Sequence, residues 1–171
     1  MSSQHSHTSS TFSVKKFPIV LVCDGVESPS NIGSLFRICD ALGVSEIIFC
    51  NALINFKSPR LQKTARSTQK KVSYSESTSI VTTIEKLKKN GFTIVALEIT
   101  DSSIAIKDFS LPTNQKIALV IGNEQKGVSN EVLKYISIAV HIEMYGENSS
   151  MNVVQATAIA LHSIVNKLYL Y

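Results

Sequence analysis

The stretch IAVHIEMYGENSSMNVVQATAIALHSIV, residues 138–165, is the part of the sequence that most clearly indicates the fold. It begins with apolar and polar residues in alternation, which is typical of a short half-buried strand. Polar and turn-forming residues follow from Tyr145 to Ser150, and Asn152 then leads into apolar residues at helical spacing. Ser149 or Ser150 is expected to cap that helix. A polar loop in this position either builds a ligand site or only connects the last strand and helix of an α/β core.

The composition fits a single domain. The chain has 171 residues, of which 44% are hydrophobic and 7% aromatic, and it contains no Trp, as suits an aliphatic parallel-sheet core. No apolar run reaches membrane-spanning length. We expect residues 1–15 to be a disordered tail without the features of a secretion signal, and residues 16–171 to form the domain.

Three cysteines, Cys23, Cys39 and Cys50, are widely spaced in apolar surroundings and form no metal-binding pattern. They are predicted to be reduced core residues, which indicates a cytoplasmic protein. No metal site is expected.

The net charge of +4 is unevenly distributed. Residues 51–74, called the basic segment below, hold six basic residues and no acidic one: Lys57, Arg60, Lys63, Arg66, Lys70 and Lys71. Such a segment is either a surface for a polyanion or simply a solvated basic face.

Strands and helices alternate along the chain. Apolar runs predict strands over residues 17–23, 45–50, 92–97, 116–121 and 138–142. Helical spacing predicts helices over residues 31–42, 77–90 and 129–135 and from Asn152 onward, with Pro59 opening a short helix in the basic segment. Residues 98–115 are polar and are expected to be irregular. This order predicts an α/β fold with a mostly parallel sheet sandwiched by helices.

Three short motifs carry polar side chains that could form a site. They are Asn31-Ile-Gly33-Ser-Leu-Phe-Arg37, Gly122-Asn-Glu124-Gln-Lys-Gly127 and Ser150-Met151-Asn152. Gly33 lies one helical turn before Arg37, so we expect it to leave the surface beside the guanidinium open to a substrate. The two glycines of the second motif allow a sharp turn and a close approach of the backbone to a ligand, with Glu124 as polar anchor.

Together these motifs resemble the SpoU/TrmH branch of the SPOUT methyltransferases. The patterns of that family are Asn-x-Gly-x-x-x-Arg, Gly-x-Glu-x-x-Gly and Ser-Leu-Asn-Val-Ser, and the resemblance covers roughly residues 17–168. Met151 stands for the usual Leu, Val154 for Ser and Glu143 for Pro, and the last change is expected to loosen the ligand loop. The basic segment lacks the family's Ser-x-Gly-Ala end, and the auxiliary N-terminal RNA-binding domain of many relatives is absent.

The resemblance implies a C-terminal trefoil knot, in which the last helix threads through a loop of the chain and the knot forms the pocket for S-adenosylmethionine. Leu97, Gly122, Ile142 and Met151 would line that pocket. The family forms homodimers, in which Arg37 of one subunit would reach a site completed by the other. Ala156 and Ala160 would suit a close helix contact at that interface.

The implied reaction is methyl transfer to a ribose 2′-hydroxyl of RNA, with tRNA favoured over rRNA because no extra RNA domain is present. Arg37 would act either as general base or as an electrostatic stabiliser that holds the adjacent phosphate. Hydrogen bonds from Asn31, Glu124, Ser150 and Asn152 would orient Arg37 and the ribose. Phosphate contacts would come from the Lys-rich face of the helix over residues 77–90, with Lys86, Lys88 and Lys89, and from the basic segment: Lys57, Arg60, Lys63, Arg66 and Lys70.

Two other readings stay open: a knotted RNA-binding protein without catalysis, and a knotted methyltransferase that acts on a base nitrogen. His141 and His162 are interpreted as structural residues.

Overall fold

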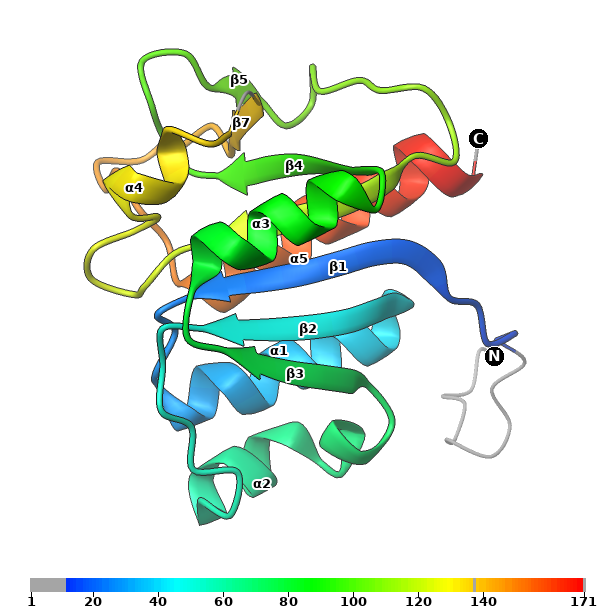
Figure 1. Ribbon diagram of the computed structural model, residues 1–171, viewed down its shortest axis with the longest axis vertical. Helices are drawn as coiled ribbons and strands as arrows, with labels where there is room; N and C mark the ends of the chain where they lie inside the picture. The colour runs from blue at the N-terminus through cyan, green and yellow to red at the C-terminus, as the bar shows by residue number, and fades with distance from the viewer. Residues whose placement is uncertain (1–11, 137, 171) are drawn as a thin grey trace, which may run out of the picture.

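The computed structural model describes residues 12–136 and 138–170; residues 1–11 of the expected tail lie outside this part of the chain. Seven strands form one sheet in the order β3-β2-β1-β6-β4-β7-β5, and all pairings are parallel (Figure 1). The strands are β1 (Phe17–Asp24), β2 (Val44–Cys50), β3 (Ser73–Ser77), β4 (Phe92–Leu97), β5 (Ile104–Ala105), β6 (Lys116–Ile121) and β7 (Ile138–His141). The predicted parallel α/β sheet is confirmed.

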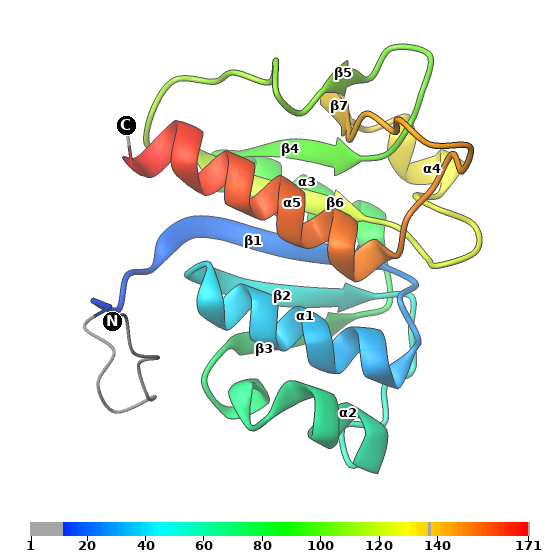
Figure 2. The same cartoon turned by 180° about the vertical axis from the view of Figure 1, so that it is seen from behind.

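Helices cover both faces of the sheet. Figure 1 shows α3 on the near face, and Figure 2 shows α1 and α5 side by side on the opposite face. The helices are α1 (Pro29–Ala41), α2 (Pro59–Ala65), α3 (Ile80–Lys89), α4 (Asn130–Leu133) and α5 (Val153–Val165), with a short 3₁₀ turn η1 (Thr68–Lys70) and a π-helical turn η2 (Asn166–Leu170). None of these helices is long and apolar enough to cross a membrane.

The sheet divides the core into two layers, as the inner strand β1 shows. Ile19 and Leu21 pack under α1 and α5, whereas Val20 and Val22 pack under α3, and all four are buried. Because successive side chains point to opposite faces, a strand covered on both sides must be apolar throughout. The continuous apolar runs of the sequence therefore identified the central strands.

The two edge strands β3 and β5 were not predicted. β3 has the sequence Ser-Tyr-Ser-Glu-Ser and is mostly exposed, so it lacks the apolar residues that reveal a strand. β5 has two residues, within a stretch that we expected to be irregular. These two segments are strands because their backbones pair with β2 and β7, respectively.

The expectation that Gly33 opens a surface for substrate is wrong. Gly33 is buried where α1 crosses α2. A Cβ at this position would lie 2.5 Å from the carbonyl oxygen of Leu61 and 2.9 Å from the amide nitrogen of Ala65. The missing side chain lets two helices approach each other, and no space remains there for a ligand.

The end of α5 is tied to the connection that precedes β6. The Lys167 ammonium donates hydrogen bonds to the carbonyls of Ile106 and Phe109, 3.0 Å each, and to that of Lys107. The hydroxyl of Tyr169 donates to the carbonyl of Gln115. Residues 106–115 therefore lie against η2, the turn that follows α5. These contacts do not establish how the chain is threaded, so the trefoil knot stays a prediction.

Ala160 is fully buried in the core of the protomer, in the layer that α1 and α5 share. Its predicted place at a subunit interface is therefore wrong, because its small side chain serves packing within the chain.

Candidate active site

A cavity of about 520 Å³ lies at the carboxyl ends of β4, β6 and β7. Carboxyl ends of parallel strands are the usual place for a ligand site in an open α/β sheet. The four residues predicted to hold the cofactor all line it: Leu97, Gly122, Ile142 and Met151. Apolar side chains of Ile121 and Val153 complete much of its wall, and Glu124, Ser149 and Ser150 add polar groups.

The Gly122–Gly127 loop forms one side of the cavity. Asn123 and Gly127 exchange two backbone hydrogen bonds of 3.0 Å, and the Asn123 side chain donates to the carbonyl of Gly25 at 2.6 Å. Gly122 is buried, and a Cβ there would overlap the backbone of Gly127 and Val128. The glycine is therefore required by the tight turn, as the motif indicated.

Glu98 is a cavity residue that the sequence reasoning missed. Its carboxylate accepts hydrogen bonds from the amides of Ile99 at 2.9 Å and Val128 at 2.8 Å. A Cβ on Gly127 would overlap this carboxylate, so the second glycine of the motif leaves room for Glu98. Its position directly after a buried strand was the signal that could have identified it.

Three polar side chains, one from each motif, meet beside the cavity. The amide of Asn152 donates to Asn31 Oδ1 at 3.4 Å, and the amide of Asn31 donates to Glu124 Oε1 at 2.9 Å. The backbone amide of Ser28 also donates to Glu124 Oε1, at 3.2 Å. These contacts link residues 121 positions apart in the chain, and they fix the carboxylate of Glu124.

Asn152, rather than Ser149 or Ser150, caps α5. Its Oδ1 accepts the amide of Val154 at 2.8 Å, while its amide group points to Asn31. The two serines precede the cap and lie on the cavity wall. Ser150 is exposed and takes no part in the hydrogen bonds between the motifs.

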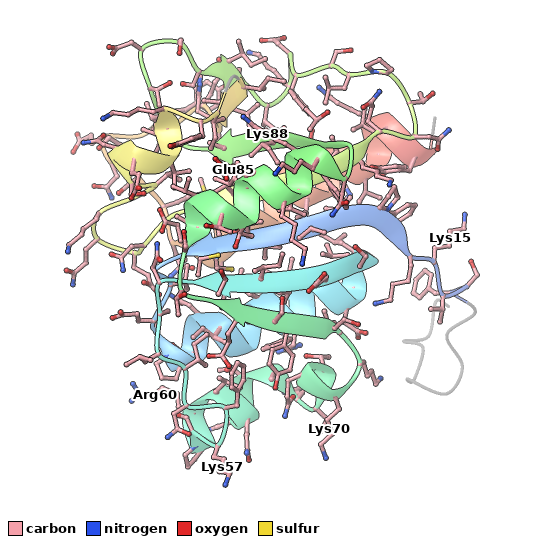
Figure 3. All side chains as sticks on the ribbon, viewed as in Figure 1. Lys15, Lys57, Arg60, Lys70, Glu85 and Lys88 are labelled. Atoms are coloured by element: carbon pink, nitrogen blue, oxygen red, sulfur yellow. The ribbon has the colours of Figure 1, made fainter. Side chains whose placement is uncertain are left out.

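Arg37 and the basic residues lie outside the cavity. Arg37 is exposed on α1, and it is not a lining residue. Lys57, Arg60 and Lys70 mark the position of the basic segment at one end of the molecule, around α2 and η1 (Figure 3). Every predicted RNA-binding residue is exposed: Lys57, Arg60, Lys63, Arg66 and Lys70.

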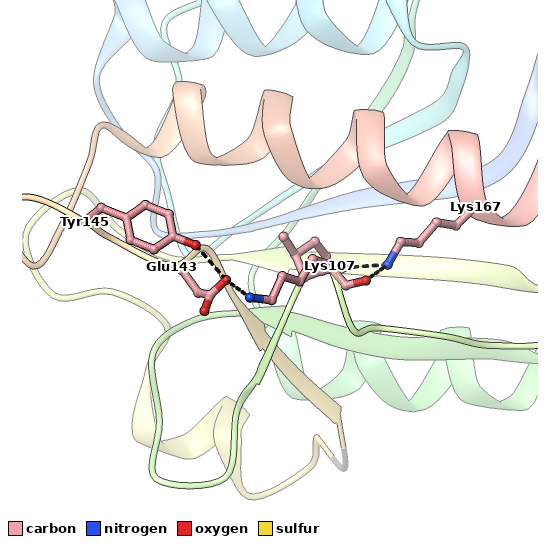
Figure 4. A network of polar contacts seen from close by, with 5 residues as sticks. Lys107, Glu143, Tyr145 and Lys167 are labelled. Atoms are coloured by element: carbon pink, nitrogen blue, oxygen red, sulfur yellow. Dashed lines mark hydrogen bonds and ion pairs between the residues drawn. The ribbon is translucent and has the colours of Figure 1, made fainter.

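Glu143, which was expected to loosen the loop, takes part in an ion pair and a hydrogen bond there. Its Oε2 atom lies 2.5 Å from the Lys107 ammonium and accepts the hydroxyl of Tyr145 at 3.0 Å (Figure 4). The hydrogen bond and charge of Lys107, with the bond from Tyr145, lower the pKa of Glu143, and the same ion pair raises the pKa of Lys107. This pair could not be predicted from the sequence, because its two partners lie on separate segments.

His141, interpreted as structural, lies in the cavity wall. Its Nδ1 is 3.0 Å from Ser103 Oγ, and that hydroxyl donates to the carbonyl of Thr100. In residues 12–136 and 138–170, no group of three His, Cys, Asp or Glu side chains is arranged to hold a metal ion.

Comparison with known proteins agrees with this geometry. The model of the SpoU rRNA Methylase family matches residues 18–162. The chain belongs to the SpoU methylase family. The match includes all three motifs and every strand and reaches into α5, so the SpoU resemblance seen in the sequence is confirmed.

Proteins similar to this chain include enzymes named for RNA modification. The chain is 28% identical over 153 residues to the tRNA (guanosine(18)-2′-O)-methyltransferase of Saccharomyces cerevisiae, covering 88% of this chain and 10% of that protein. The A. aeolicus TrmH/SpoU tRNA modifying enzyme aligns with a TM-score of 0.78 and 26% identity, over 90% of this chain and 77% of the other.

A third relative was solved with a bound cofactor. The SpoU methyltransferase AviRb from Streptomyces viridochromogenes, in complex with AdoMet, aligns with a TM-score of 0.74 and 26% identity, over 89% of this chain and 58% of that one. The chain spans between 10 and 60% of the length of the first curated relatives it matches.

Proposed function

We propose that this protein transfers a methyl group from S-adenosylmethionine to a ribose 2′-hydroxyl of RNA, with tRNA as the favoured substrate. The observation that carries the proposal is the meeting of the three family motifs in one hydrogen-bonded chain, Asn152–Asn31–Glu124, beside a cavity at the carboxyl ends of the strands. Two relatives are named as tRNA-modifying enzymes, which supports tRNA as the substrate class.

The cavity fits the proposed cofactor in size and chemistry. Its volume of about 520 Å³ lies within the range of small-molecule sites, roughly 300–1,000 Å³. Leu97, Ile142 and Met151 provide apolar walls for a flat purine, and Gly122 allows the loop beside them to fold tightly. When bound, S-adenosylmethionine supplies a methyl group on a positively charged sulfur.

The residues beside the cavity can orient the acceptor hydroxyl. Glu124 is held by Asn31 and by the amide of Ser28, so its carboxylate keeps one orientation. Such a fixed acceptor can position a ribose hydroxyl without any rearrangement during the reaction. The hydroxyl must lose its proton, and a nearby cation would stabilise the developing negative charge on oxygen.

Arg37 is proposed as that cation, delivered by a second subunit. Its guanidinium is exposed and is not part of the cavity of its own chain, which supports a homodimer in which each site borrows Arg37 from its partner. A guanidinium retains its proton in proteins, so we assign it to charge stabilisation and phosphate contact rather than to general-base catalysis.

We also propose that the protein is located in the cytoplasm, which is a reducing compartment. The cysteines are free and buried, as is usual where thiols stay reduced. Burial raises the pKa of Cys50 to about 11 and raises the pKa values of Cys23 and Cys39 as well, so all three remain protonated and unreactive at neutral pH.

Labelled methyl transfer tests the proposal. The protein is incubated with labelled S-adenosylmethionine and bulk tRNA or rRNA, and nuclease digestion then identifies the product. A 2′-O-methylated nucleotide is expected. Label on a base nitrogen would indicate the alternative acceptor, and binding of RNA without label transfer would indicate the non-catalytic alternative.

Replacing Arg37 tests its role. Arg37→Ala should lower kcat by about 100-fold or more, because it removes a charge that acts on the transition state. Affinity for S-adenosylhomocysteine, measured by calorimetry, should not change, because Arg37 is not in the cavity. An Arg37→Ala enzyme that methylates as fast as the unmodified protein would exclude this role.

A further inference from the structure

The outer edge of the sheet, where β3 meets α2 and η1, carries an exposed aromatic ring within the basic segment. Tyr74 of β3 is 41% exposed. Its ring lies 4.6 Å from that of Phe56 at an interplanar angle of 31°, and 5.4 Å from that of the buried Phe36 in an edge-on arrangement. Phe36 and Phe56 therefore restrain the ring, while part of Tyr74 remains exposed to solvent.

The six cations of the basic segment, in which Tyr74 also lies, take part in no ion pair in the described residues. In the part of the chain that the structure describes, the only ion pair is Lys107–Glu143, which lies in another region. All six cations of the basic segment are exposed: Lys57, Arg60, Lys63, Arg66, Lys70 and Lys71. Glu76 is the one acidic residue of β3, and it shares the face of Tyr74 because it lies two positions further along the strand.

The backbone between α2 and η1 is strained at a basic residue. Arg66 and Ser67 both adopt left-handed conformations, with φ values of 48° and 70°. A residue with a side chain is disfavoured there by roughly 1–2 kcal/mol, and glycine is not. Strain of this kind is commonly found where a side chain is needed for function, which is consistent with use of the Arg66 charge.

We propose that this edge binds single-stranded RNA, with Tyr74 stacking on an unpaired base and the basic segment holding the neighbouring phosphates. A restrained aromatic ring in a basic surface is the arrangement that binds single strands, since every base offers a flat face for stacking. A duplex covers those faces and offers only phosphates and groove edges. The inference rests on the proposed function and narrows its substrate to RNA with an unpaired segment at the contact.

Fluorescence anisotropy with the full chain tests this inference. The probes are a labelled single-stranded RNA oligonucleotide and a duplex of the same length, each titrated at several salt concentrations. Tyr74→Leu should weaken binding of the single strand by about 5- to 150-fold and leave the duplex affinity unchanged. The salt dependence of single-strand binding should not change in this variant, because no charge is removed. Tyr74→Phe, which keeps the ring, should bind both probes like the unmodified protein.

Two further variants test the same surface if Tyr74→Leu does not fold. Glu76→Gln should tighten binding of the single strand, because it removes the acidic group beside Tyr74. Arg66→Gly should raise the melting temperature by relieving strain, while it weakens RNA binding and reduces the slope of log Kd against log salt by about 0.7, the value for one phosphate contact on a single strand.

Equal affinity of a folded Tyr74→Leu protein and the unmodified protein for the single strand would overturn the inference, and so would equal losses for both probes. Calorimetry with S-adenosylhomocysteine separates this from the proposed function. Protein that binds this ligand but has no affinity for the oligonucleotide would disprove the RNA surface and leave the cofactor site standing. Absence of ligand binding would instead contradict the proposed methyl transfer.

Discussion

At the residue scale, two glycines show how a missing side chain determines the structure. Gly33 allows α2 to pack against α1, and Gly122 allows the cavity loop to fold back on itself. In both cases the atoms that a Cβ would meet belong mainly to the backbone, which cannot move aside as a flexible side chain can. Both positions are therefore fixed by packing, although both stand in motifs associated with ligands.

Gly33→Ala should destabilise the protein by about 1–3 kcal/mol or more, because overpacking forces the two helices apart. Chemical denaturation followed by circular dichroism measures this change in the free energy of unfolding. Gly146→Ala is the matched control: no atom lies within 4 Å of a Cβ built there, so stability should stay within about 0.5 kcal/mol. Equal stability of the two variants would contradict the observed helix crossing.

Asn152 has two separable tasks. Its oxygen caps α5 and its amide group donates to Asn31. Asn152→Ser keeps a capping oxygen and loses the amide donor, so stability should change little while the rate of methyl transfer falls. Asn152→Ala should lower the free energy of unfolding by about 0.5–2 kcal/mol as well. A serine variant with full activity would show that the contact to Asn31 is not used.

At the element scale, the loop between β7 and α5 is held by few polar contacts. Among the described residues, no backbone hydrogen bond ties residues 142–151 to the rest of the protein, and the side-chain hydrogen bonds and ion pairs of residues 142–150 all involve Glu143. This loop contributes Ile142, Met144 and Met151 to the cavity wall. The exposed ion pair with Lys107 is therefore a polar contact on which the position of this part of the cavity wall depends.

Breaking this ion pair should make the loop more mobile. Lys107→Glu and Glu143→Lys should each lower the NMR order parameters of the backbone amides of residues 142–151, because the ion pair is lost. The double variant, which reverses both charges, should restore the order parameters, and high salt should reproduce the effect of either single variant. If the order parameters of the double variant are as low as those of the single ones, the pair does not restrain the loop.

The pKa shifts of the two partners define the pH range of this restraint. The pKa of Glu143 is lowered, so its contribution is present above the ordinary value of about 4.3 and is lost as the pH falls through the lowered pKa. The pKa of Lys107 is raised, so its contribution is present below about 10.4 and is lost as the pH rises through the raised pKa. Between pH 6 and 9 the ion pair should therefore persist.

At the scale of the whole molecule, the cavity and the basic segment lie apart. The cavity is built on β4, β6 and β7, whereas the basic segment surrounds α2 beyond the β3 edge of the sheet (Figures 1 and 3). An RNA that meets both would have to cross the carboxyl ends of the strands, or reach from one subunit to the other. On either path, the contacts that give affinity come from the basic segment, and those that position the reacting ribose come from the residues beside the cavity.

Neutralising Lys63, Arg66 and Lys70 together, each by Gln, should weaken RNA binding and flatten its salt dependence. Each lost phosphate contact should reduce the slope of log Kd against log salt by about 0.7 to 0.9. The matched comparison is Lys86, Lys88 and Lys89 of α3, replaced in the same way, because they carry equal charge on the other predicted phosphate surface. Unchanged affinity of the first triple variant across the salt titration would exclude the basic segment as an RNA contact.

Sequence alone was sufficient where one physical signal dominated. The apolar runs of β4 and β6 predicted both strands with the bounds that the structure has. Pro59 predicted the start of α2, since proline suits the first turn of a helix. β3 could not be found in this way, because its polar side chains are exposed and only its pairing with β2 makes it a strand.

The sequence by itself determined the fold class, the family and the residues of the three motifs, because burial and tight turns restrict the residue types at those positions. Only the tertiary structure decided how those residues are used. Gly33 packs against a helix, Glu98 faces the cavity, and Glu143 pairs with Lys107. Each of these roles depends on a partner distant in the chain, and a contact between distant residues is set by the packing of whole elements rather than by local sequence.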